Sequence, residues 1–403
     1  MQWYRISVVA GAVFGMCALT RGQTSPPDSN PENIEDVTAE SEVQTQKPLL
    51  TIERPFYNAL QAKKQQWKEK YGLELAVAYT TIYQITSGGI DHNSAAASTF
   101  SIYSLWKFIR DPDGVDGTGL GFQFENRADH TSDQFPEMTR DLGTLWSPND
   151  SSSDNYSQIK QLWLATRFAD GMFTLQAGKI DPTAYINKNR FAGSDKSQFF
   201  SQPLATNPAR GFPSNGLGIQ GRFVPTKWMY IHGVVSDSDA DSNYSPFKTI
   251  NGNWIYAGEV GFTPDVPNLG AGNYAFTVYQ RNTDGNTGSG FAMSVAQDLG
   301  PEYGVFLRYA VQNGGFKPSE QILATGLSFL RPFGRTNDQA GVGISWTRPD
   351  DHDLRDEYAG EIYYRLQLTD GIELSASTQL IKDPSDSEKD WEAIYGMRVR
   401  FLY

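Results

Sequence analysis

Cysteine, histidine and long apolar runs are scarce in this 403-residue sequence, and each scarcity excludes a class of protein. A single cysteine, Cys17, excludes a disulfide framework, and the four histidines form no tight metal-binding or hydrolase spacing. No segment offers the roughly 20 consecutive apolar residues of a membrane-spanning helix, and the mean hydropathy is −0.47. With 46 acidic and 34 basic residues, the chain has a net charge of −12 and no basic cluster. Nucleic acid is therefore not an expected partner, because binding phosphate requires a basic face.

The pattern of the N-terminal region predicts that the protein is exported. Arg5 precedes a mostly apolar run over residues 6–19, which is too short to span a bilayer and typical of a signal-peptide core. We predict a signal peptide at residues 1–22, with lipidation of Cys17 as the alternative. Residues 23–54 are rich in Pro, Ser, Glu and Asp and predict an acidic disordered linker. Residues 55–71, between Pro55 and Gly72, predict a short periplasmic helix.

From residue 72 onward the hydrophobic pattern has a period of two. Leu120, Phe122 and Phe124, for example, alternate with Gly121 and Gln123. Short alternating segments separated by turn residues are typical of a transmembrane antiparallel β-barrel. We predict about 16 strands, an even number, at residues 72–84, 98–109, 118–128, 158–168, 172–180, 216–223, 227–236, 253–262, 273–282, 289–298, 302–312, 321–331, 339–347, 357–368, 371–381 and 391–403.

The connections between these strands support a barrel that crosses a membrane. Residues 129–157, 181–215 and 237–252 form the longest connections, and all three follow odd-numbered strands. Short periplasmic turns opposite long outer loops are typical of porins, with both chain ends on the periplasmic side. Aromatic residues near strand ends, such as Trp106 and Trp391, match the aromatic belts at membrane interfaces. A soluble β-sandwich is the alternative, although it gives no reason to gather the longest loops at one end.

The connection after the fifth predicted strand carries a family resemblance. Residues 176–223 contain the ordered elements GKID, Tyr, NRFA, QFF, NPA and FPSNGLG. This order resembles the carbohydrate-selective outer-membrane porin family of OprB type, and the resemblance extends over roughly residues 55–403. It implies a 16-stranded barrel through which sugars diffuse, and a long loop that folds into the lumen. It also implies that the following residues form the constriction or support it: Lys179, Asp181, Asn189, Arg190 and Phe191.

Inward-facing positions of the predicted strands supply suitable chemistry for a sugar. A polyol needs groups that donate and accept hydrogen bonds, and aromatic faces that stack on its C–H surfaces. Arginine offers a planar fork of donors, and carboxylates accept hydrogen bonds from hydroxyls. The candidate wall residues are Glu125, Arg127, Trp163, Arg167 and Arg222. The competing interpretation is that Arg–Glu pairs only brace a wide, water-filled barrel.

We therefore predict an all-β outer-membrane porin that lets mono- and small oligosaccharides diffuse passively into the periplasm. We assign no catalytic residue, cofactor or metal. The expected partners are sugars, outer-membrane lipid and lipopolysaccharide, and the barrel-assembly machinery, and the barrel is either a monomer or a homotrimer. Two alternatives remain open, namely a general or anion-leaning porin of the same fold and a barrel-embedded hydrolase.

One acidic loop resembles a calcium site only in part. Asp237, Asp239 and Asp241 have the alternating spacing of a calcium loop. Ser242 replaces the glycine of the turn, and Lys248 stands where the last glutamate belongs. A solvated acidic loop is the expected state, with loose calcium binding as the alternative.

Overall fold

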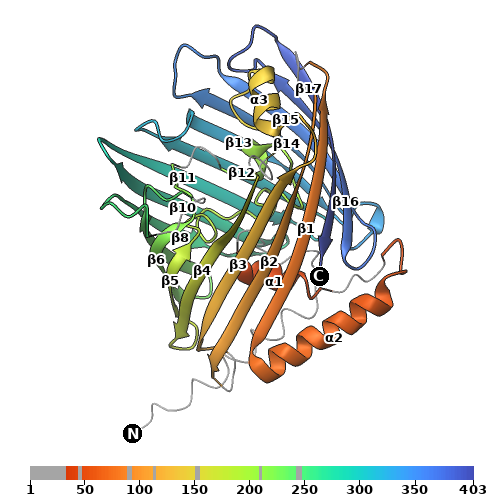
Figure 1. Ribbon diagram of the computed structural model, residues 1–403, viewed down its shortest axis with the longest axis vertical. Coiled ribbons are helices and arrows are strands. Elements are labelled where there is room, and N and C mark those ends of the chain that lie inside the picture. The colour runs from red at the N-terminus through yellow and green to blue at the C-terminus, as the bar shows by residue number, and fades with distance from the viewer. Residues whose placement is uncertain are drawn as a thin grey trace.

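The computed structural model describes residues 33–43, 48–88, 93–111, 115–149, 155–207, 211–241 and 247–403. The predicted signal peptide at residues 1–22 lies outside these ranges. The described chain is a single antiparallel sheet closed on itself, because β1 pairs with β17 as well as with β2 (Figure 1). One strand, β9, has only two residues, which pair with the first two residues of β10. The barrel wall therefore consists of sixteen long strands.

The strands follow one another around the wall in chain order, and all sixteen predicted segments are confirmed. Their bounds are β1 (Leu73–Thr86), β2 (Ser94–Arg110), β3 (Gly117–Asp129), β4 (Tyr156–Phe168), β5 (Phe173–Ile180), β6 (Gly216–Thr226), β7 (Met229–Asp237), β8 (Trp254–Phe262), β9 (Asp265–Val266), β10 (Gly270–Thr283), β11 (Asn286–Leu299), β12 (Tyr303–Gln312), β13 (Ser319–Leu330), β14 (Gln339–Pro349), β15 (Glu357–Gln367), β16 (Ile372–Lys382) and β17 (Trp391–Leu402). The helices are α1 (Ile34–Glu40), α2 (Arg54–Tyr71), α3 (Phe135–Leu142), α4 (Gln202–Ala205) and a 3₁₀ turn at Pro332–Gly334.

The two faces of the wall differ in polarity as the period-two pattern requires. Val278 and Ile362 are each 60% exposed on the outside, whereas their neighbours Thr277 and Glu361 are 0% and 3% exposed. Such an apolar exterior around a polar interior is stable only where the outside meets lipid. Closure is equally necessary, because every backbone N–H and C=O in lipid needs an internal partner.

Connection length separates the two ends of the barrel. At the end that we call the short-connection end, turns such as 169–172 and 300–302 join the strands. At the opposite, long-connection end, the strands are joined by the connections numbered 130–155, 181–215 and 238–253, although the connection 284–285 there is a two-residue turn. The predicted segregation of the longest loops is therefore confirmed.

The described parts of the connection between β5 and β6, residues 181–207 and 211–215, fold into the barrel, as the family resemblance implies. We call this segment the inward connection. Phe199 and Phe200 have no exposed surface. The Phe199 ring lies 5.5 Å from that of Phe306 and 4.8 Å from that of Tyr363, both on the inner wall. The backbone N–H groups of Phe200 and Ser201 donate to the Glu361 carboxylate at 2.8 Å each. Apolar contacts and charge-assisted hydrogen bonds thus hold this connection against β12 and β15.

Helix α3 lies in the connection 130–155, for which the sequence pattern predicted no helix. Its start carries a local signal, since the Glu137 carboxylate accepts a 3.0 Å hydrogen bond from the Gln134 N–H. Phe135, Met138 and Leu142 are buried in one apolar cluster with wall residues of β1, β2 and β17. A helix with this single apolar face gains stability mainly from packing, so eight residues of sequence gave little indication of it.

The prediction of a disordered linker over residues 23–54 is wrong where the structure describes that region. Residues 34–40 form helix α1, which lies behind β2 and β3 within the ring of strands (Figure 1). The Asn33 side chain caps the helix by accepting from the N–H groups of Glu35 and Asp36 at 2.9 and 3.2 Å. An acidic composition predicts disorder only when no oppositely charged surface is available, and here the inner wall supplies one.

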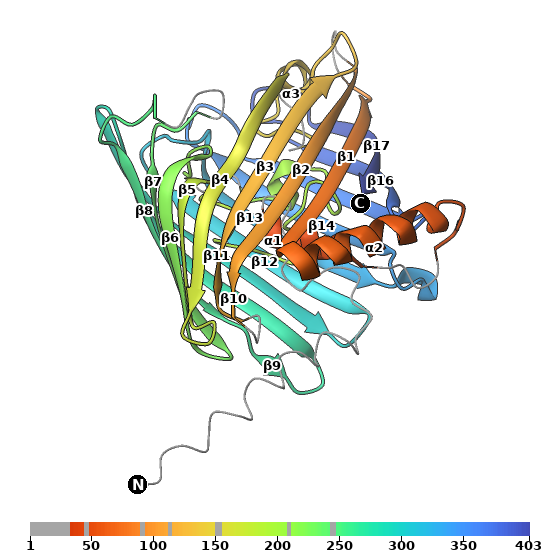
Figure 2. The same ribbon diagram turned by 60° about the horizontal axis from the view of Figure 1, so that its bottom comes forward.

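Helix α2 agrees with the predicted helix at residues 55–71. It ends at Gly72 in the left-handed conformation, with φ of 70°, where a side chain would also meet the Lys107 carbonyl. It lies outside the barrel, along the short-connection end (Figure 2). Across the described ranges, no helix is long and apolar enough to cross a membrane.

Gly304 provides a test of how the inward connection is anchored. A Cβ at this position would overlap the ring of Phe191, so Gly304→Ala is expected to destabilise the fold by about 1–3 kcal/mol. Combining it with Phe191→Ala removes the clash, so the double variant is expected to lose less than the sum of the two single losses. Urea unfolding in detergent micelles measures each free energy.

Gly258→Ala is the matched control, because a Cβ there meets nothing within 4 Å. It is expected to change stability by no more than about 0.5 kcal/mol. Strict additivity of the Gly304 and Phe191 effects would show that the two residues do not share one packing site.

Candidate functional site in the barrel lumen

A polar pocket of about 220 Å³ lies inside the barrel. Its walls come from α1, strands of the wall and the inward connection. The lining residues are Asn33, Glu35, Asp36, Ala165, Arg167, Thr174, Gln176, Tyr185, Lys188, Gln220, Arg222, Tyr230, His232 and Asn273. A single water needs only about 10–15 Å³, so the pocket has room for a polar solute or several waters.

Aromatic and cationic groups lie against one another in the lining of this pocket. The Arg222 guanidinium lies 4.8 Å from the centre of the Tyr230 ring, and Lys188 Nζ lies 5.7 Å from the Tyr185 ring. Tyr185 also meets His232 edge-on, with ring centres 6.1 Å apart. The pocket therefore offers ring faces for C–H groups and planar donors for hydroxyls.

Tyr185 belongs to the inward connection and presents its ring to the pocket. Burial raises the pKa of its hydroxyl well above the usual value, and the nearby Glu35 carboxylate raises it further. The phenol therefore remains a hydrogen-bond donor over the physiological pH range.

Of the ten predicted site residues, Arg167 and Arg222 line the pocket. Arg167, on β4, lies 3.7 Å from the Glu35 carboxylate of α1, and its side chain is 43% exposed. Arg222, on β6, projects from the same side of the wall. The period-two pattern thus identified two wall cations that the fold brings to one cavity.

Glu125 and Arg127 belong to a buried ionic cluster outside the pocket lining. The fully buried Glu125 carboxylate lies 3.0 Å from Arg127 and 3.4 Å from both Lys160 and Lys196. Tyr156 donates its hydroxyl proton to the same carboxylate at 2.5 Å. Since Lys196 comes from the inward connection, this cluster ties that connection to β3 and β4.

Asn189, Arg190 and Phe191 fix the tip of the inward connection to the wall. Asn189 accepts hydrogen bonds from the N–H groups of Phe191 and Ala192, and its amide donates to the Val295 carbonyl at 3.0 Å. Arg190, whose side chain is only 8% exposed, pairs with Asp298 at 2.5 Å. In the described structure these three residues act as anchors and do not line the pocket.

Trp163, Lys179 and Asp181 also lie away from the pocket surface. The Trp163 ring fills the space over Gly121 and is 1% exposed. Lys179 is buried near the end of β5. Asp181 begins the inward connection by accepting from the N–H and hydroxyl of Thr183 at 2.7 Å each.

Several pocket residues were not among the predicted ones. Tyr185 and Lys188 lie inside the stretch that carries the family resemblance, whereas Glu35 and Asp36 lie in the segment predicted to be disordered. The available signal was Asn33, a favoured helix N-cap, with Ile34 and Val37 spaced for one apolar helix face.

The acidic loop with the partial calcium pattern is internally hydrogen-bonded. Asp237 accepts from the Asp239 N–H at 3.1 Å and from the Thr249 hydroxyl, and Asp239 accepts from the Asn253 amide at 2.6 Å. Within the described ranges, no group of three His, Cys, Asp or Glu residues is placed to hold a metal ion.

A closed barrel with an apolar exterior and a polar, partly filled lumen defines a channel-forming outer-membrane protein. Residues 71–403 match the family described as carbohydrate-selective porin, OprB family, and the chain belongs to this family. It is therefore a porin of the bacterial outer membrane through which sugars permeate, and the predicted resemblance is confirmed.

Two solved structures of OprB from Pseudomonas putida resemble this fold. The high-pH structure shares 14% identity with a TM-score of 0.70, over 85% of this chain and 96% of that chain. The low-pH structure shares 14% identity with a TM-score of 0.58, over 90% and 100% of the respective chains. At this identity the likeness supports the fold alone. A search among curated proteins finds no match to the sequence.

Glu125 provides a test of the buried ionic cluster. Glu125→Ala leaves three buried cations without their shared carboxylate, and is expected to cost about 3–5 kcal/mol of unfolding free energy. Urea unfolding measures this loss. The folded and unfolded fractions are read from their different migration on a gel. Glu320→Ala, which removes an exposed partner of His352, is the control and is expected to cost at most about 1 kcal/mol. Equal losses in the two variants would contradict the bracing role.

Proposed function

We propose that permeating sugars pass through the luminal pocket and contact Arg167, Tyr185, Arg222 and Tyr230 on the way. The observation that carries this proposal is the pairing of Arg222 with the Tyr230 ring inside a polar cavity. A sugar hydroxyl can accept from the guanidinium while a C–H face stacks on a neighbouring ring. Selectivity then depends on pore width and on hydrogen bonding at the wall.

The remaining predicted site residues support this pathway indirectly. Glu125, Arg127, Asn189, Arg190 and Phe191 hold the inward connection in place, and so fix the positions of Tyr185 and Lys188. Lys179, Asp181 and Trp163 shape the start of the same connection. Passage is passive, and the chain acts as a channel without a catalytic step.

We assign the short-connection end to the periplasm, because porins place their short turns there. Residues 1–22 then serve as the export signal, and α2 lies at the periplasmic mouth. The apolar belt contacts outer-membrane lipid, and the loops at the other end contact lipopolysaccharide. The barrel-assembly machinery inserts the protein, which works as a monomer or a homotrimer.

The general or anion-leaning porin remains the second candidate, because cations are frequent on the inner wall. Glucose titration of single-channel current in planar bilayers separates the two. A sugar-selective pore is expected to show a saturable fall in current, whereas a general diffusion pore shows little concentration-dependent block.

Arg222→Ala tests the proposed sugar contact. Loss of a charge-assisted hydrogen bond is expected to raise the half-blocking glucose concentration by about tenfold or more. Arg348→Ala is the control, because this arginine is half-exposed and lies outside the pocket lining. A pore that conducts normally and has the same half-blocking concentration in both variants would remove Arg222 from the sugar path.

A further inference from the structure

Helix α1 packs against the inner wall near the short-connection end of the barrel. Ile34 and Val37 are 0% and 2% exposed, and they share an apolar cluster with Ala76, Tyr103 and Leu105. Ala76 lies near the start of β1, and Leu105 lies near the end of β2. These positions place α1 in the half of the lumen next to α2.

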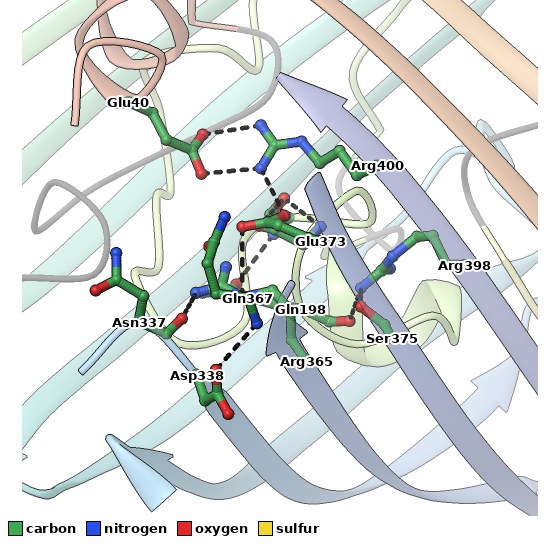
Figure 3. Close-up of polar contacts among 12 residues, drawn as sticks. Glu40, Gln198, Asn337, Asp338, Arg365, Gln367, Glu373, Ser375, Arg398 and Arg400 are labelled. Carbon is green, nitrogen blue, oxygen red and sulfur yellow. Dashed lines mark hydrogen bonds and ion pairs between the residues drawn. The ribbon is translucent and has the colours of Figure 1, made fainter. Parts of the chain in front are cut away.

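The polar face of α1 is joined to three separate parts of the lumen. Glu40 forms a two-bond pair with the Arg400 guanidinium at 2.9 Å for each bond (Figure 3). Asp36 lies 2.9 Å from Lys188 of the inward connection, and Glu35 lies 3.7 Å from Arg167 on β4. The helix therefore connects β17, β4 and the inward connection.

The chain that leaves α1 is held by α2 outside the barrel. Lys64 donates to the Ser41 hydroxyl at 2.6 Å, and Gln61 donates to the Ser41 carbonyl at 2.8 Å. Tyr57 donates to the Val43 carbonyl at 3.1 Å, and Lys68 pairs with Glu42 at 2.8 Å. Helix α2 thus fixes the point at which this segment enters the lumen.

The charge of the α1 segment, residues 33–43, is complementary to that of the barrel wall it faces. Residues 33–43 contain four carboxylates and no basic residue, whereas β15 and β17 present Arg365, Arg398 and Arg400 to the lumen (Figure 3). Glu373 shares this surface, at 3.6 Å from Arg365 and 3.2 Å from Arg400.

The Glu373 carboxylate is shared between Arg365 and Arg400, and Glu40 supplies a second carboxylate to Arg400. Burial alone would raise the pKa of Glu40, but the Arg400 charge and hydrogen bonds more than offset this and keep the pKa below its ordinary value. The Glu40 side chain therefore remains ionised at neutral pH.

We propose that α1 is an internal selectivity element, which narrows the periplasmic half of the lumen and cancels cationic charge on its wall. This inference rests on the proposed passage of solutes through the luminal pocket, since the N-cap Asn33 and two residues of α1, Glu35 and Asp36, line that pocket. Without α1, the pocket lining contains Arg167, Lys188 and Arg222 and no carboxylate, so it favours anions. With α1 in place, Glu35 and Asp36 offset two of these three positive charges, so that neutral sugars are not outcompeted by anions.

The charge part of the proposal is tested in the full chain by neutralising Glu35→Gln, Asp36→Asn and Glu40→Gln together. Reversal potentials across a salt gradient are expected to show a rise of about threefold or more in the anion-to-cation permeability ratio. The matched control neutralises three exposed carboxylates outside the lumen, Glu69→Gln, Asp265→Asn and Glu302→Gln. Its permeability ratio is expected to stay close to wild type, because salt screens exposed charges over a Debye length of about 10 Å or less.

The steric part is tested by excising residues 33–43. This variant is expected to form channels with about twofold or greater conductance and the same shift toward anions. A folded barrel with unchanged conductance and unchanged permeability ratio would overturn the proposal. Gel migration before and after heating establishes that each variant has folded.

A thiol placed on α1 tests its position without removing it. Glu35→Cys in a Cys17→Ser background is labelled with an anionic or a cationic methanethiosulfonate reagent. The anionic adduct is expected to retain the wild-type permeability ratio, and the cationic adduct is expected to raise it toward anions. Complete labelling with no effect of either charge, or no labelling at all, would show that α1 lies outside the conducting path.

Failure of the proposed sugar path gives a different result. In that case Arg222→Ala would leave the half-blocking glucose concentration unchanged, whatever the state of α1. Glu69→Cys on the outer surface of α2 is the control for labelling, and neither adduct there is expected to change the permeability ratio.

Discussion

The pairing of β1 with β17 is the constraint on which the rest of the structure depends. It runs from Ala78 opposite Leu402 to Thr86 opposite Ile394, and it leaves no open edge among the sixteen long strands. In lipid an open edge would expose unpaired N–H and C=O groups, each at a cost of several kcal/mol. Once the sheet is closed, the inside and outside are separate environments, and every second side chain must suit one of them.

The closed barrel encloses an interior whose volume must be filled and whose buried charges must be paired. A barrel of this size has more internal volume than its wall side chains fill, and here chain segments enter it from both ends. The connection 181–215 comes from the long-connection end and is held by Glu125, Glu361 and Arg398. Helix α1 comes from the other end and is held by Arg400. Ion pairs serve this purpose well, because a buried charge without a partner would be strongly destabilising.

The same arrangement relates stability to function. Glu125, Asn189 and Arg190 make contacts between the inward connection and the barrel wall. Arg167, Arg222, Tyr185 and Tyr230 instead line the pocket through which we propose that sugars pass. Arg190 illustrates the difference. It stands in the motif with the strongest resemblance, yet its guanidinium is paired with Asp298 and nearly buried. A motif can therefore be characteristic of a family because it positions a loop, without itself contacting the solute.

The sequence alone determined the sixteen strands, their inward and outward faces, the ends at which long loops gather and the family. These features depend on a period of two and on local turn residues, which are visible within a few residues of one another. Only the tertiary structure decided which inward residues share the pocket, and that residues 34–40 form a helix inside the lumen. Glu40 and Arg400 are 360 residues apart in the chain, and their pairing exists only because barrel closure brings them together. Composition alone predicted a disordered acidic linker, since it cannot show which distant cations a segment will meet.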